Sequence, residues 1–152
     1  EYKSLSAGAG TMTVTINGVA QPVTTPNLAA GGDYTVLVWG TPAAPQTSVI
    51  SDDNRLPAAG SAKLRLVNGV SNLNAGLSMT MDFSSLASNI QPGSASTPFT
   101  AVASTSSTLS VTSPTQGTAV YSITTPIAAG GIYTFFMTGD VTNIIAKPVK
   151  EP

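Results

Sequence analysis

Apolar and polar residues alternate along most of this chain with a period of two, and no long segment shows helical spacing. Met12, Val14 and Ile16, for example, are separated by Thr13 and Thr15. Such alternation, closed by Gly, Pro or Asn, is typical of strands with one buried face. Val, Ile and Thr, which favour strands, dominate these stretches. The pattern predicts an all-β protein with about a dozen short strands at the spacing of a β-sandwich.

An internal repeat divides the chain into two related parts. Residues 24–35 and 124–134 both contain Thr-Thr-Pro, then Ala-Ala-Gly-Gly and then a Tyr-Thr pair. In each part a short apolar strand follows and ends at a glycine, Gly40 or Gly139. Upstream of this element the match continues at a constant offset of 97 residues. The repeat predicts two modules of common ancestry in tandem.

The second module is the more complete one and is expected to span residues 62–147. The first module, residues 1–51, begins only at the fourth strand of the second, so about 35 residues (some three strands) are expected to be missing from its front. Residues 52–61, rich in Asp, Pro and Gly, are interpreted as a linker and residues 148–152 as a tail. The expected strands of the second module lie near residues 62–68, 77–83, 86–90, 98–103, 107–113, 118–124, 132–138 and 142–146.

Each module places a tyrosine two residues after its glycine pair, at the start of an apolar strand. These residues, Tyr34 and Tyr133, fit the tyrosine corner of Greek-key sandwiches. In that motif the ring packs in the core and the hydroxyl bonds to nearby backbone. A structural role is therefore favoured for both residues over contact with a ligand.

Two segments of the second module carry a resemblance to a known family. They are Ala-Lys-Leu-Arg-Leu-Val-Asn-Gly-Val-Ser at 62–71 and Leu-Ser-Met-Thr-Met-Asp at 77–82. Together with the Ala-Ala-Gly-Gly-x-Tyr-Thr strand of both modules, they resemble the bacterial domain-of-unknown-function 4397 family. The resemblance covers the second module and the available part of the first. It implies Greek-key, immunoglobulin-like sandwiches in exported or lipid-anchored envelope proteins, often in tandem, and it supplies no catalytic residues. Members often carry His or Asp-Ala-Pro after the first strand, where this chain has residues 68–74.

Composition narrows the setting in which such a protein works. Only 9% of residues are charged and the net charge is −1, so the chain lacks the cation cluster that nucleic-acid binding needs. The longest apolar runs are a few residues, so no segment is expected to span a bilayer. The chain begins with Glu1 and not Met, which suggests a processed or excised product. With the Ser- and Thr-rich composition, we expect an extracellular or cell-envelope location, in the periplasm or on the outer surface.

Candidate chemistry is limited because the chain has no His and no Cys. Triads with His, thiol nucleophiles and His or Cys metal sites are therefore excluded. Asp52, Asp53 and Asn54 offer oxygen atoms to calcium, but a solvated linker is the favoured interpretation. We expect no enzyme activity and no cofactor. An enzyme would need paired carboxylates, and the candidates, which all lie at predicted turns or strand ends, are Asp33, Asp52, Asp53, Asp82 and Asp140.

One strand of the first module is apolar on both faces. Leu37 and Trp39 lie on the face opposite Tyr34, and something must cover them. They either pack against the second module or a tip loop, or form an interaction patch that stacks on sugar or docks a protein.

The missing strands of the first module leave two explanations open. Either the chain was cut at this boundary, or a neighbouring chain supplies strands by β-augmentation. The expected function is a non-catalytic structural or adhesive module of a bacterial envelope or secreted protein, acting through surface and strand-edge contacts. Its expected partner is protein, either further copies or other envelope components, with self-assembly by strand donation as one form. The alternative is a carbohydrate- or calcium-binding module, for which a glycan is the candidate partner.

Overall fold

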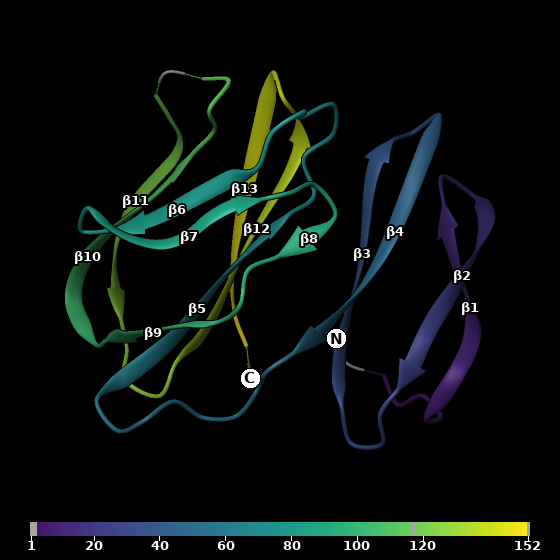
Figure 1. The fold of residues 1–152 in the computed structure, drawn as a ribbon, viewed down its shortest axis with the longest axis horizontal. Helices are drawn as coiled ribbons and strands as arrows, with labels where there is room; N and C mark the ends of the chain where they lie inside the picture. Colours follow the sequence, from purple (N-terminus) through teal and green to yellow (C-terminus); the bar gives the residue numbers. More distant parts are fainter. Residues whose placement is uncertain (1–2, 117, 152) are drawn as a thin grey trace.

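The computed structural model describes residues 3–116 and 118–151, and this part of the chain is built from strands and contains no helix (Figure 1). The all-β prediction is confirmed. In the same residues no helix has the length and apolar character needed to cross a membrane. The strands are β1 (Gly8–Ile16), β2 (Val19–Leu28), β3 (Asp33–Thr41), β4 (Ala44–Asp52), β5 (Ser61–Asn68), β6 (Leu77–Met81), β7 (Ser84–Ile90), β8 (Ser94–Ala95), β9 (Phe99–Val102), β10 (Ser104–Thr112), β11 (Ala119–Ile127), β12 (Ile132–Asp140) and β13 (Asn143–Lys150).

Strands β5 to β13 form a two-layer sandwich. One layer is the four-stranded sheet β11-β10-β6-β7, and the other is the five-stranded sheet β13-β12-β5-β8, in which β9 also pairs with β5. Strands β5 and β12 pair in parallel. Alternation explains the core, because Leu64 and Leu66 point into it while Arg65 lies on the opposite face. The fully buried side chains between the layers include Leu64, Leu66, Leu77, Met79, Leu109, Val111 and Met137.

Strands β1 to β4 form two separate hairpins beside this sandwich. Strands β1 and β2 make one two-stranded sheet, and β3 and β4 make another. In Figure 1 the β3–β4 hairpin stands between the sandwich and the β1–β2 hairpin, and β4 contacts both β2 and β8. Within the described residues, the first part of the chain therefore consists of two hairpins without the further strands that would turn them into layers.

The hairpins of the first part repeat the strand register of the second. In β3–β4 Tyr34 is opposite Ser51, and in β12–β13 Tyr133 is opposite Lys150. The two hairpins keep this correspondence along their whole length, at a spacing of 99 residues. Likewise β1–β2 and β10–β11 share a register over most of their length. Strand β3 is thus the counterpart of β12, and β1 the counterpart of β10.

Several element ends differ from those expected from the sequence. Strand β13 continues to Lys150, and the Glu151 amide donates a hydrogen bond to the Ile132 carbonyl (2.8 Å), so residues expected in a tail continue the ladder. Asp52, expected in the linker, is the last residue of β4. The short strand β8 was not anticipated. Pairing with a neighbouring strand decides these ends, and a single sequence does not show that neighbour.

Candidate functional site

The two tyrosines of the repeat make the same contact in both modules. The Tyr34 hydroxyl accepts a hydrogen bond from the Ala29 amide (2.8 Å), and the Tyr133 hydroxyl accepts one from the Ala128 amide (3.0 Å). Each ring lies against the second glycine of its pair so closely that a Cβ atom there would overlap it. This is the contact expected of a tyrosine corner, in which the ring and the hydroxyl both contact the turn just before the strand.

Leu37 and Trp39 lie in the seam between the β3–β4 hairpin and the sandwich. Leu37 is only 6% exposed, and a side chain at Gly69 would approach its methyl group. The Trp39 ring packs on Gly93, whose φ of 77° and lack of Cβ allow this approach, and its indole N–H donates to the Ser48 hydroxyl (3.0 Å). The sandwich of strands β5 to β13 therefore covers this face of β3, as in the packing interpretation of these residues.

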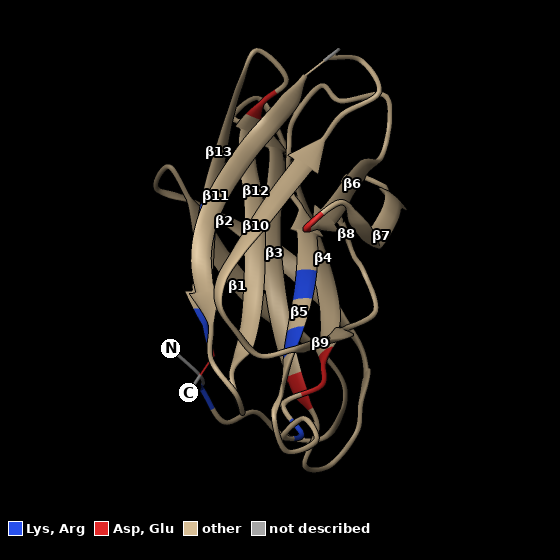
Figure 2. Cartoon of the chain, turned by 90° about the vertical axis from the view of Figure 1, so that its left-hand side faces the viewer, with Lys and Arg blue, Asp and Glu red and all other residues tan. Residues whose placement is uncertain are grey.

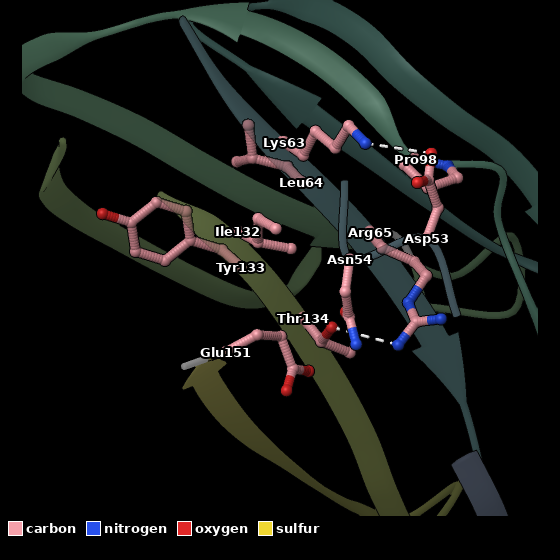
Figure 3. Close-up of a pocket in the computed structure, with 10 residues that line it drawn as sticks. All are labelled: Asp53, Asn54, Lys63, Leu64, Arg65, Pro98, Ile132, Tyr133, Thr134 and Glu151. Atoms are coloured by element: carbon pink, nitrogen blue, oxygen red, sulfur yellow. Dashed lines mark hydrogen bonds and ion pairs between the residues drawn. The ribbon is translucent and has the colours of Figure 1, made fainter. Parts of the chain in front are cut away.

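A buried ion pair fixes the other end of the seam. Asp52, at the end of β4, binds Arg65 of β5 with an oxygen–nitrogen distance of 2.6 Å, and the two side chains are 1% and 8% exposed. The pair is held from both sides, since the Thr35 hydroxyl donates to Asp52 (2.8 Å) and Arg65 donates to Thr134 (3.2 Å; Figure 3). Removing one partner would leave a buried charge without its counterion. The sequence analysis assigned no role to Arg65.

A second, more exposed ion-pair cluster follows along the chain. Asp53 binds Arg55 (2.7 Å) and Lys63 (2.9 Å), and hydrogen bonds from these two cations hold the pKa of Asp53 well below its usual value. Figure 2 shows the basic positions on β5 and the acidic ones just beyond its end. No group of three or more potential metal ligands occurs among the described residues. Here the candidate calcium ligands Asp52 and Asp53 bind cationic side chains instead.

The cavities beside the seam are poor candidates for ligand sites. The one in Figure 3 has a volume of about 10 Å³, which is room for about one water molecule. A wider groove of about 380 Å³ runs past Trp39 and Asp140. Its polar groups bind one another: Asp140 accepts bonds from Asn72 and Thr142, and the Ser71 hydroxyl donates to the Gly40 carbonyl (2.6 Å).

The candidate carboxylates all serve as local structural groups. Asp33 accepts a bond from the Asn54 amide (3.0 Å), and Asp82 accepts one from the Thr108 backbone amide (2.8 Å). The Thr142 backbone amide, with the Asn72 side chain, lowers the pKa of Asp140. Asp33 begins β3, Asp140 ends β12 and Asp82 lies in the turn between β6 and β7, positions where Asp is common.

Two strand edges lack the partner strand that their counterparts have. Strand β12 is paired on both sides, by β13 and β5, and β10 is paired by β11 and β6. Their counterparts β3 and β1 are each paired on one side only among the described residues. Core-facing residues are exposed as a result: Val38 is 39% exposed, whereas its counterpart Met137 is fully buried. The candidate functional surface is therefore the open edge of β3 and of β1.

The sequence profile of a family described as "Domain of unknown function (DUF4397)" matches residues 1–76, half of the chain. The chain belongs to this family. The DUF4397 match includes both open-edged hairpins and β5, and it ends at Gly76, before β6. No curated protein matches the chain.

Proposed function

We propose that this DUF4397 protein is a non-catalytic structural or adhesive module of a bacterial cell-envelope or secreted protein. It carries two tandem sandwich modules, the first of them incomplete, and works through strand-edge contacts with other chains. The observation that carries the proposal is that β1 and β3 have open edges where β10 and β12 have strand partners.

The sequence of these edges supports pairing with other strands. An open edge presents unpaired N–H and C=O groups, and proteins that avoid pairing usually protect it with Lys, Pro or inward-pointing charges. Strand β1 has no charged residue and β3 has only Asp33. Both edges are therefore suited to β-augmentation, in which backbone hydrogen bonds supply the affinity.

The chemistry of the chain supports a non-catalytic role. It has no His or Cys, and its turn carboxylates Asp33, Asp82 and Asp140 accept structural hydrogen bonds. Hydrolase turnover that is abolished by Asp82→Asn or Asp140→Asn would contradict this part of the proposal.

Sedimentation over a range of protein concentrations tests the proposed contacts. We expect concentration-dependent assembly that Val38→Lys weakens, because that substitution places a charge on the core-facing side of the open edge. The matched control is Val102→Lys on β9, where the valine is already 76% exposed. A strict monomer that binds glycans would instead favour the alternative function, a carbohydrate-binding module.

A further inference from the structure

We infer that the open edge of β3 accepts, in parallel, a strand of another polypeptide in which Lys or Arg alternates with apolar residues. This inference rests on the proposed function and adds the orientation, register and chemistry of the strand. Its template is β5, the strand that occupies the equivalent edge of β12.

The register of the β5–β12 pair transfers directly to β3. Lys63 is opposite Ile132 and Arg65 is opposite Thr134. The counterparts of Ile132 and Thr134 in β3 are Asp33 and Thr35, since the two hairpins share one register. A β5-type strand on β3 therefore places its first basic residue opposite Asp33 and its second opposite Thr35.

The first of these two positions on β3 is acidic. Asp33 is exposed and accepts a hydrogen bond from the neutral amide of Asn54, and none of the ion pairs among the described residues includes it. The second position, Thr35, is neutral: its hydroxyl donates to Asp52, whose charge is already paired with Arg65. Asp33 thus offers negative charge where a β5-type strand carries its first basic residue, which favours that register.

The apolar positions of such a strand match the uncovered side of β3. Leu64 and Leu66 are opposite Tyr133 and Phe135, whose counterparts are Tyr34 and Val36. In the sandwich this layer is closed, with Leu64 and Leu66 at 0% exposure. On β3 both positions remain partly exposed. A strand with leucines there would cover apolar surface that now faces solvent.

The backbone groups that would pair can also be named. The Lys63 amide donates to the Gly131 carbonyl (2.9 Å) and the Gly69 amide to the Met137 carbonyl (2.7 Å), so odd-numbered residues of β5 face β12. By the shared register, Tyr34, Val36 and Val38 of β3 turn their backbone groups to the open edge.

The test uses this chain and a capped peptide with the sequence of residues 61–68. We expect saturable binding that slows hydrogen exchange at the backbone amides of Tyr34, Val36 and Val38, while the exchange of β12 amides is unchanged. A peptide N-methylated at Lys63, Arg65 and Val67 loses the donors that face the edge and should not bind. The matched control, N-methylated at Leu64 and Leu66, should bind because those amides face away.

Charge variants test the chemistry of the strand. A peptide with Lys63→Glu and Arg65→Glu should bind at least about tenfold more weakly, since like charges would meet across the edge. Asp33→Asn in the chain should weaken binding of the unmodified peptide about fivefold, as expected for the loss of one exposed ion pair. Asp82→Asn, in the β6–β7 turn, is the control and should leave binding unchanged.

Three results would overturn the inference. The first is binding that does not distinguish the two methylated peptides or the two charge patterns. The second is dimerisation of copies through β3 that excess peptide leaves intact. The third is assembly of the chain without any binding of the peptide. Each differs from failure of the proposed function: peptide binding by a strict monomer leaves the strand inference in place, whereas assembly without peptide binding leaves the function in place and removes the inference.

Discussion

The Asp52–Arg65 pair should hold the β3–β4 hairpin against the sandwich. Arg65→Met removes the cation and leaves a carboxylate that is 1% exposed, with the Thr35 hydroxyl as its remaining hydrogen-bond partner. Removing one partner of a buried pair costs about 3 to 5 kcal/mol. Because Thr35 still donates to Asp52, we expect the lower end, about 3 kcal/mol for unfolding. Asp52→Asn in the same background should add little, so the two effects should be coupled by about 2 kcal/mol.

Urea unfolding followed by tryptophan fluorescence measures this effect at the right place. The chain has one tryptophan, Trp39, and it packs on Gly93 in the same seam. Far-UV circular dichroism reports the strands as a whole. We expect Arg65→Met to lower the fluorescence midpoint, and to lower it more than the circular dichroism midpoint if the hairpin detaches before the sandwich unfolds.

The exposed pair of Arg55 and Asp53 is the control. Arg55 is 87% exposed at its side chain, so Arg55→Met should leave both midpoints unchanged. The reasoning is refuted if Arg65→Met costs less than about 1 kcal/mol, the range of an exposed pair, or if the two substitutions at Asp52 and Arg65 are additive.

The remaining predictions concern the core, the tyrosine corner and acid stability. Leu109→Ala, at 0% exposure, should lower the free energy of unfolding by about 2 to 5 kcal/mol in denaturant titration, while Leu56→Ala, at 79% exposure, should change it little. Gly131→Ala should cost about 1 to 3 kcal/mol and shift the Tyr133 ring signals in NMR spectra, because a Cβ atom there overlaps the ring. Thermal unfolding across pH should show stability lost below about pH 4: Asp140 has a folded pKa below its usual 3.8, so its contribution is complete above that value and disappears as pH falls through the folded pKa. Asp140→Asn should reduce this loss of stability at low pH. If the loss is the same in the variant, Asp140 does not contribute to it.

The local sequence pattern was sufficient to predict the strands and the two tyrosine corners. Alternation at Met12, Val14 and Ile16 predicted β1, and the Gly-Gly-x-Tyr element predicted where β3 and β12 begin. These features are readable because side-chain direction in a strand and glycine at a turn depend on residues close in sequence.

Other roles depended on contacts across the fold. Asp52 looked like a linker residue because its partner, Arg65, lies thirteen residues away on another sheet. For Leu37 and Trp39 the sequence favoured packing but left an exposed patch open, and the structure places Gly69 and Gly93 against them.

The sequence by itself determined the strand content, the repeat and the absence of His and Cys chemistry. The repeat also predicted that the first part lacks strands, and the tertiary structure decided which edges remain without a partner strand among the described residues. Strands β3 and β12 share Tyr, Thr and Gly at equivalent positions and have one register, yet among the described residues β12 pairs with β5 and β3 has no strand on the equivalent edge. The physical reason is that the N–H and C=O groups of an edge pair with the backbone of another segment. The residues of a strand therefore do not show whether such a segment lies beside it.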